Sequence, residues 1–150
     1  MFNLLYNSYI KPIEGGRILQ TIIEIRVKEE DIDALGHVNY NKFIAYSEQA
    51  IGDWYKKAGL DWHKQENRQL GTVVVNLNVS YIKEARLGEV LKVVTTPVKL
   101  GTKSFQLKQE IFNANDELIT EFSKKFVMFD LTTRKGMVVV NEIARHFPKE

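Results

Sequence analysis

The chain has 150 residues, a length that fits one domain with its own hydrophobic core. It contains no cysteine, which excludes a disulfide framework, a thiolate metal site and a cysteine nucleophile. Its 21 basic and 19 acidic residues are mixed along the sequence and give a formal net charge of +2, so the composition does not indicate a nucleic-acid-binding surface.

The N-terminal region, residues 1–16, mixes apolar and polar residues. It lacks the basic start and continuous apolar stretch of a signal peptide, and no part of the chain has the ~18 apolar residues of a membrane span. We therefore predict a cytoplasmic protein without a membrane span. Gly15 and Gly16 mark a break, so residues 1–16 are interpreted as an extension ahead of a single domain over 17–150. The β-branched residues 18–27 predict its first strand.

A long amphipathic helix is predicted between residues 40 and 58. Asn39 or Asn41 can cap its start, and Gly59 stands where a left-handed residue commonly ends a helix. The predicted helix has about five turns. Its apolar stripe recurs at steps of three and four residues and consists of Tyr40, Phe43, Ile44, Ser47, Ile51, Trp54, Tyr55 and Ala58.

After a polar loop at residues 60–71, the apolar pattern changes to a period of two and predicts several strands. One face of the first is predicted to carry Val73, Val75, Leu77, Val79 and Tyr81. A second strand lies near 89–99, and the next two carry Phe105, Leu107, Gln109 and Ile111, and then Phe122, Phe126 and Met128. Their short turns indicate hairpins in an antiparallel sheet. A short helix over 142–147, capped by Asn141, ends the chain.

The sum of these elements is an α+β domain. A sheet with one apolar face must cover that face, and the long helix is the only adequate cover that the sequence offers. We therefore expect one helix lying across an antiparallel sheet.

Chemically able side chains are most dense in the loop before the long helix. Asp33 and His37 are candidate acid–base groups, and Gly36 allows the backbone to turn or a ligand to approach closely. The helix begins a few residues later, so its unpaired N–H groups can bind an anion or a developing oxyanion. A carboxylate beside such a helix end can hydrolyse an acyl group, because the N–H groups polarise the carbonyl while the carboxylate attacks it or activates water.

Each of these residues also has a purely structural interpretation. An aspartate just before a helix is commonly a cap or a turn former, and a single histidine in a loop is commonly solvated. Tyr40 lies on the apolar stripe and is most simply a core aromatic residue. Local spacing alone therefore does not make this chain an enzyme.

A more specific signal is the run DIDALGHVNYNKF at residues 31–43, with Tyr46-Ser47-Glu48 on the next turn. This run resembles the hotdog-fold acyl-CoA thioesterases, and most closely the 4-hydroxybenzoyl-CoA thioesterase family. The resemblance extends over residues 17–147, through VSYIK at 79–83, LGEVL at 87–91 and FVMFD at 126–130. In two places the chain departs from the family's pattern: Tyr40 replaces a common second asparagine, and Glu84 stands where a proline is common.

The resemblance implies a hotdog fold, in which an antiparallel sheet wraps around one long central helix, and a homodimer or homotetramer with active sites at the subunit interface. It assigns the catalytic carboxylate to Asp33 and the polarising N–H to Tyr40, with His37 as a supporting group. Because coenzyme A carries phosphates, Lys83, Arg86 and Lys103 at strand ends or turns are candidates to bind them. Glu48 is either a supporting carboxylate or a solvated helix residue.

The expected reaction is hydrolysis of a fatty or aromatic acyl thioester to a free acid and coenzyme A. Asp33 would act as general base or nucleophile, and neither a metal nor a further cofactor would be needed, since coenzyme A is part of the substrate. Two alternatives remain open at this point: an acyl-CoA-binding protein without turnover, and a hotdog-fold dehydratase of 3-hydroxyacyl thioesters.

Overall fold

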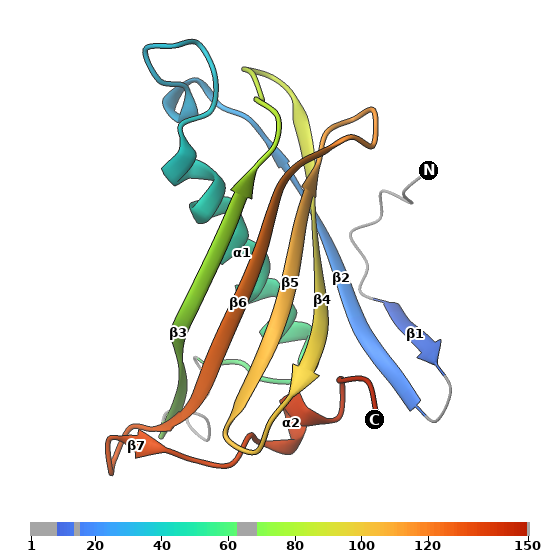
Figure 1. Ribbon diagram of the computed structural model, residues 1–150, viewed down its shortest axis with the longest axis vertical. Coiled ribbons are helices and arrows are strands. Elements are labelled where there is room, and N and C mark those ends of the chain that lie inside the picture. Colours follow the sequence, from blue (N-terminus) through green and yellow to red (C-terminus); the bar gives the residue numbers. More distant parts are fainter. Residues whose placement is uncertain (1–8, 14–15, 63–68, 150) are drawn as a thin grey trace.

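The computed structural model describes residues 9–13, 16–62 and 69–149 (Figure 1). In this part of the chain the main elements are a long helix, a short C-terminal helix and a set of β-strands. Their bounds are β1 (Tyr9–Ile13), β2 (Gly16–Arg26), the 3₁₀-helix η1 (Glu29–Asp31), α1 (Tyr40–Ala58), β3 (Leu70–Tyr81), β4 (Val90–Leu100), β5 (Ser104–Phe112), β6 (Leu118–Asp130), β7 (Lys135–Gly136) and α2 (Asn141–Ala144).

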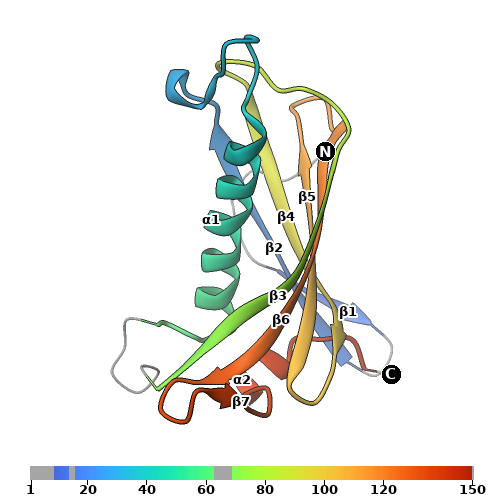
Figure 2. The ribbon, with the colours of Figure 1, turned by 60° about the vertical axis from the view of Figure 1, so that its left-hand side comes forward.

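The strands form one antiparallel sheet in the order β1-β2-β4-β5-β6-β3, with β7 added beside β6. Helix α1 packs on one face of this sheet, over β2 and β4 (Figure 2). The predicted α+β fold, with hairpins and one long covering helix, is therefore confirmed. None of the helices described has both the length and the apolar character needed to cross a bilayer.

The core lies between α1 and the inner face of the sheet. Along β5 every second residue is buried, as the alternation predicts, which places Phe105, Leu107, Gln109 and Ile111 on the inner face. Trp54 of α1 is fully buried, and its Nε1–H donates to the carbonyl oxygen of Leu19 on β2 at 3.0 Å. This bond satisfies the polar end of the largest core side chain and fixes α1 against β2.

Helix α1 has the predicted bounds because both ends carry residues suited to them. The Asn39 side chain accepts a hydrogen bond from the Asn41 N–H at 2.9 Å, so Asn39 rather than Asn41 is the cap. Gly59 ends the helix in the left-handed conformation, with φ of +109°. A residue with a side chain would be strained there, which explains the glycine.

Strand β3 differs from its prediction because it contains a β-bulge between Val74 and Asn76. The extra residue reverses the alternation, so Val73 and Leu77 point to opposite sides of the sheet. The residues paired with the buried positions of β6 are Thr72, Val74, Leu77, Val79 and Tyr81. Leu77, Val79 and Tyr81 therefore share a face as predicted, whereas Val73 lies on the opposite one, so the predicted common face is wrong for the part of the strand before the bulge. Of the predicted loop at 60–71, residues 63–68 lie outside the described residues, and Leu60 is buried in the core.

The two ends of the chain also differ from expectation. Residues 9–13, within the predicted N-terminal extension, form β1 and pair with β2, so this part of the extension belongs to the sheet. The domain boundary at residue 17 itself stays a prediction. Helix α2 begins at Asn141 with Val140 as its cap, and it ends at Ala144 instead of 147. Asn141 is thus a helical residue, and the predicted cap is wrong.

The segment after α2 closes the C-terminal end of α1. Arg145 donates from a guanidinium nitrogen to the Ala58 carbonyl oxygen at 2.9 Å, and the His146 Nε2 lies 3.1 Å from the same oxygen. The last carbonyls of a helix lack intrahelical partners, so these contacts give the Ala58 carbonyl the hydrogen bonds that the helix cannot supply.

The position of His146 predicts a pH-dependent stability. Burial, together with the nearby Arg145 charge, lowers the pKa of His146 from its ordinary value of 6.5, although the Ala58 carbonyl opposes the shift. The unfolded chain therefore takes up this proton at a higher pH than the folded chain does. The stability that the neutral ring contributes should be fully present above pH 6.5 and decrease as the pH falls below it. Urea unfolding at pH 7.5 and 5.5 should show a larger drop for the wild type than for His146→Gln, and equal drops would contradict the assignment.

Candidate active site at the start of the long helix

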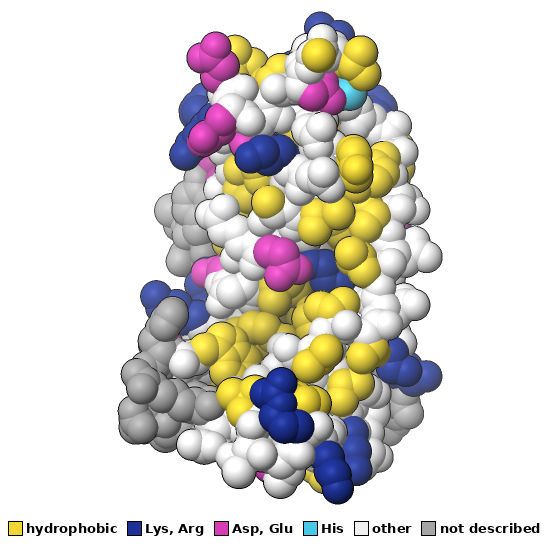
Figure 3. Space-filling model, turned by 90° about the vertical axis from the view of Figure 1, so that its left-hand side faces the viewer, with side chains coloured by type: hydrophobic (Ala, Val, Ile, Leu, Met, Phe, Trp, Pro, Cys, Tyr) yellow, Lys and Arg dark blue, Asp and Glu magenta, His cyan; other side chains and the backbone are white. Residues whose placement is uncertain are grey.

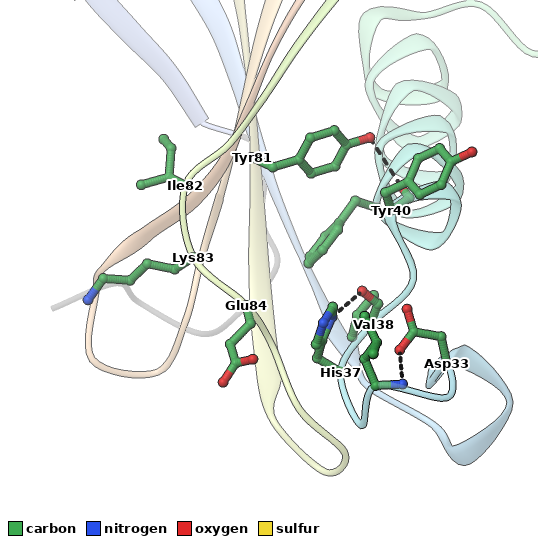
Figure 4. A pocket seen from close by; sticks show the side chains of 10 residues that line it. Asp33, His37, Val38, Tyr40, Tyr81, Ile82, Lys83 and Glu84 are labelled. Carbon is green, nitrogen blue, oxygen red and sulfur yellow. Dashed lines mark hydrogen bonds between the residues drawn. The ribbon is translucent and has the colours of Figure 1, made fainter.

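A pocket of about 430 Å³ lies at the N-terminal end of α1 (Figure 4). One wall is the loop and first turn at residues 33–43, and the other is the end of β3 with the segment after it, residues 81–84. The lining side chains are those of Asp33, Leu35, His37, Val38, Tyr40, Phe43, Tyr81, Ile82, Lys83 and Glu84. Three sequence-predicted catalytic residues, Asp33, His37 and Tyr40, thus meet in one pocket.

A tight turn with backbone hydrogen bonds holds Asp33 and His37 next to each other in the loop. The Asp33 N–H donates to the His37 carbonyl oxygen at 3.0 Å, and the Gly36 N–H donates to the Asp33 carbonyl oxygen at 3.0 Å. Gly36 has a φ of +86°, which only glycine adopts without strain. The Val38 N–H then donates to the Ala85 carbonyl oxygen at 2.8 Å, which fixes the loop against the connection between β3 and β4.

The half-buried Asp33 combines the structural and the chemical interpretation. One carboxylate oxygen accepts a hydrogen bond from the Leu35 N–H at 2.9 Å, as expected for a turn-forming aspartate. Its other oxygen makes no hydrogen bond to any described residue, and in Figure 4 it points toward the side on which α1 begins. A carboxylate held by one bond with one oxygen free can act on a ligand in the pocket. On the neighbouring backbone, His37 Nδ1 lies 3.3 Å from the Val38 carbonyl oxygen.

The helix end offers the complementary group. The Asn39 side chain takes the Asn41 N–H, and the Asn39 carbonyl takes the Lys42 N–H at 2.9 Å. The Tyr40 N–H makes no hydrogen bond within the part of the chain that the structure describes. It is therefore available at the positive end of the helix dipole, where an oxyanion is stabilised.

The Tyr40 side chain is not the core aromatic residue that the stripe suggests, since it is 60% exposed. Its ring makes an edge-to-face contact with Tyr81, at 6.3 Å between centroids, and the Tyr81 hydroxyl donates to the Tyr40 carbonyl oxygen at 3.2 Å. Tyr40 is the first residue of α1, so its ring lies at the end of the helix and not over the centre of the sheet. The ring instead forms part of the pocket wall.

Asp31, the other aspartate of the motif, has a different environment. It is buried, its carboxylate accepts hydrogen bonds from the Tyr46 hydroxyl at 2.7 Å and the Lys28 N–H at 3.1 Å, and the Lys42 ammonium lies 3.7 Å away. Burial alone would raise the pKa of Asp31, but these bonds and charges outweigh it and lower the pKa. Asp31 therefore fastens the loop to α1, which leaves Asp33 as the aspartate of the motif that lines the pocket.

The predicted phosphate-binding residues are only partly brought together. Lys83 lines the pocket, but its ammonium forms an ion pair with Glu117 and points away from Asp33 in Figure 4. Arg86 lies just beyond, paired with Glu84 at 2.7 Å. Lys103 lies at the other end of the sheet, because the 11 residues of β4, about 36 Å of extended chain, separate it from this segment. The structure of the chain does not place Lys103 in this pocket.

Glu48 does not support Asp33. Its carboxylate lies 2.6 Å from the ammonium of Lys124 on β6. Glu48 itself stands eight residues after Tyr40 on α1. Sequence reasoning missed Lys124, because a lysine within a strand ordinarily faces solvent. It also missed that Ile82 and Glu84 line the pocket, since nothing local to these residues signals a wall opposite Asp33.

Comparisons with known proteins agree with this architecture. A family model described as the thioesterase-like superfamily matches residues 27–147. The long-chain acyl-CoA thioesterase FadM of Escherichia coli (strain K12) is 27% identical over 122 residues, which cover 80% of this chain and 91% of that protein. The acyl-CoA thioester hydrolase YbgC of Escherichia coli O6:H1 is 26% identical over 123 residues, which cover 82% of this chain and 92% of that protein.

The same likeness appears among solved structures. The crystal structure of a DHNA-CoA thioesterase from Staphylococcus aureus has a TM-score of 0.73 and 28% identity to this chain, covering 79% of this chain and 80% of that one. The predicted hotdog fold is thereby confirmed. The family match extends from the loop that carries Asp33 to the C-terminal segment. This chain belongs to the thioesterase-like superfamily.

Proposed function

We propose that this protein hydrolyses acyl-CoA thioesters to a carboxylic acid and coenzyme A, with Asp33 and the start of α1 as the reaction centre. The observation that carries the proposal is that Asp33 and Tyr40 line one pocket, and that among the described residues one Asp33 carboxylate oxygen and the Tyr40 N–H make no hydrogen bond. The acyl-CoA thioesterase activity in the names of two relatives supports the same reaction.

In the proposed reaction the thioester carbonyl oxygen accepts a hydrogen bond from the Tyr40 N–H. Asp33 takes a proton from a water molecule, whose oxygen bonds to the carbonyl carbon, and the negative charge that develops on the carbonyl oxygen faces the helix end. When the carbonyl reforms, the carbon–sulfur bond breaks and Asp33 returns the proton to the leaving thiolate. His37 would orient the water or the substrate. No metal and no cofactor enter these steps.

Asp33 could instead attack the carbonyl carbon directly and form a mixed anhydride, which water then opens. The two routes differ in where solvent oxygen goes. In a single turnover in ¹⁸O-labelled water, the general-base route places the label only in the released acid. The nucleophilic route places it in the enzyme's carboxylate when water attacks on the Asp33 side.

The test of the proposed function is direct. The purified protein is mixed with a panel of saturated, branched and aromatic acyl-CoA substrates, and free thiol is followed with a thiol-reactive dye. Thiol release with at least one class supports the proposal. Tight binding without thiol release would indicate a binding protein, and hydration of an enoyl-CoA without thiol release would indicate a dehydratase.

Coenzyme A is the proposed carrier of the acyl group. Lys83 and Arg86 lie at or just beyond the pocket wall, where a side-chain rearrangement from Glu117 and Glu84 would free their charges for phosphate. Lys103 could contribute only from a second copy of the chain. The cytoplasmic location predicted from the sequence stays a prediction.

We further propose that two copies pair through β3. This strand lies at the edge of the sheet, is 12 residues long, and exposes hydrophobic side chains that include Val73, Val74, Val75 and Leu77. A long apolar edge strand invites another strand, so antiparallel pairing with a second copy would extend the sheet and cover these side chains. Dimers that pair again would give the homotetramer implied by the resemblance.

A charge on this edge should separate the copies. Val75→Lys places an ammonium group on a side chain that is 53% exposed, where it would have to be buried by pairing. We expect light scattering after size exclusion to show a dimer or tetramer for the wild type and mainly monomer for this variant. Val138→Lys, at a side chain that is 61% exposed and away from β3, is the matched control and should leave the mass unchanged. A wild-type monomer would contradict the pairing.

A further inference from the structure

The Tyr81 side chain spans the gap between β3 and the start of α1, at one end of the active-site pocket. Tyr81 is the last residue of β3 and stands directly opposite Thr120 of β6, which is fully buried, so the Tyr81 ring points to the inner side of the sheet as well. Its hydroxyl donates to the Tyr40 carbonyl oxygen at 3.2 Å, and Figure 4 shows the ring reaching across to α1. The strand holds one end of this side chain and the helix holds the other.

Two further rings keep Tyr81 in this position. Its ring contacts that of Tyr40 edge-to-face at 6.3 Å between centroids, and that of Phe43 in a tilted arrangement at 6.0 Å. Phe43 is buried in the core and contacts the Tyr46 ring, so Tyr81 packs against a fixed support. Burial and the neighbouring Tyr40 raise the pKa of Tyr81 above its ordinary value of 10.0, so its hydroxyl keeps the proton that it donates. The three rings together close this end of the pocket.

The pocket ends at Tyr81 and does not continue along β3. Its lining includes Tyr81 but none of the residues of β3 before it. Farther along the strand the inward side chains of Val74 and Leu77 are exposed, and Figure 3 shows hydrophobic side chains gathered on the side of the molecule where α1 and β3 lie. The proposed pairing of two copies through β3 would cover Val74 and Leu77. A ligand in the pocket therefore meets the Tyr81 ring as a closed wall.

The lining gives the pocket an acyl end and a coenzyme A end. Tyr40, Phe43 and Tyr81 make one end aromatic and uncharged, whereas Lys83 and Glu84 make the other end charged. The phosphates of coenzyme A suit the charged end, where a basic side chain can bind them. A thioester whose carbonyl oxygen is bound at the Tyr40 N–H then directs its acyl group to the aromatic end. There the acyl group follows the first turn of α1 until it meets the Tyr81 ring.

The helix gives the depth of the aromatic end. The Tyr81 ring contacts the side chains at positions 40 and 43, so it stands beside the first turn of α1, which rises about 5.4 Å. An extended chain of carbon–carbon bonds of ~1.5 Å advances about 1.25 Å per carbon, so about four carbons beyond the carbonyl carbon fill this turn. The remainder of a longer chain would have to turn out to solvent, where its additional methylene groups gain no burial.

We infer that the Tyr81 ring is the wall that ends the acyl-binding part of the pocket, and that it limits productive binding of straight-chain acyl groups to about five carbons. The inference rests on the proposed hydrolysis of acyl-CoA, whose acyl specificity it defines. It assigns a specificity-determining role to Tyr81, separate from the reaction centre formed by Asp33 and the Tyr40 N–H.

The test compares kcat/KM of the wild type and of Tyr81→Ala across straight-chain acyl-CoA substrates of two to twelve carbons, below their micelle concentrations. For the wild type, kcat/KM should rise about fourfold with each added methylene group up to about five carbons and then stay level. Removing the ring frees the space that it fills, which is about four carbons long. The values for the variant should therefore rise to about nine carbons and exceed those of the wild type there by at least about tenfold.

Two control variants separate the ring from its surroundings. Tyr81→Phe keeps the ring and removes only the hydroxyl, so its values should level off at the wild-type length. Ile82→Ala changes the next residue, which lines the same pocket but points away from α1 in Figure 4, and its values should also level off at the wild-type length. An equal shift in Tyr81→Phe and Tyr81→Ala would overturn the role of the ring as the wall.

Tyr81→Leu tests the same wall, should Tyr81→Ala fail to fold by circular dichroism. Leucine fills part of the space of the ring, so the rise should extend by about two carbons. A folded Tyr81→Ala or Tyr81→Leu variant with the wild-type length profile would overturn the inference. Absence of thiol release from every substrate with the wild type would instead overturn the proposed function itself.

Discussion

Asp33→Asn should lower kcat/KM for every acyl-CoA substrate by about 10²–10⁴-fold, the usual contribution of a positioned acid–base group. The amide cannot take a proton from water and is a poor nucleophile, so both possible routes lose their central group. Its oxygen can still accept the hydrogen bond from the Leu35 N–H, so the turn should persist. The measurement is thiol release under substrate-limited conditions, beside a thermal melt that verifies folding.

The control for this variant lies in the same pocket. Glu84→Gln removes a carboxylate from the opposite wall while keeping its size, and it should change kcat/KM by less than about tenfold. If Asp33→Asn kept full activity while Glu84→Gln lost it, the reaction centre would lie on the other wall. Full activity in both variants would remove the pocket's carboxylates from the chemistry.

Asp31→Ala should instead lower the free energy of unfolding by about 2–3 kcal/mol, because it leaves the Tyr46 hydroxyl and the Lys28 N–H without their acceptor. The pKa of Asp31 is lowered in the folded chain, so the stability from its carboxylate is present above the ordinary value of 3.8 and is lost as the pH falls through the folded value. Urea unfolding at pH 7 measures the loss, and the difference between wild type and variant should shrink at strongly acidic pH.

Asp33→Ala, two residues away, is the matched control for stability. Its carboxylate is half-buried and makes one hydrogen bond to the described residues, so its removal should cost less than about 1 kcal/mol. Asp33→Ala should thus be folded but inactive. Asp31→Ala should be less stable, but its folded fraction should be active. An equal loss of stability in both would contradict the division of roles between the two aspartates.

The sequence alone determined the features that depend on local chemistry. Asn39 and Gly59 define the ends of α1, because a cap and a left-handed C-terminal residue act within one turn of the helix. The alternation of β5 predicted its buried face, because the side-chain period of a strand is a property of the strand itself. The run around Asp33 led to the family and to the aspartate that faces the pocket, although local spacing could not separate it from Asp31.

The tertiary structure decided what depends on residues far apart in the chain. The bulge in β3 put Val73 on the face opposite Leu77, Val79 and Tyr81, because register is set by pairing with β6 and not by the strand's own sequence. Lys103 is separated from the pocket because β4 carries the chain to the other end of the sheet, and Lys83 is held by Glu117. The Glu48–Lys124 pair joins residues 76 positions apart. Only packing α1 on the sheet brings them together, because burying the lysine requires a carboxylate partner that the helix supplies.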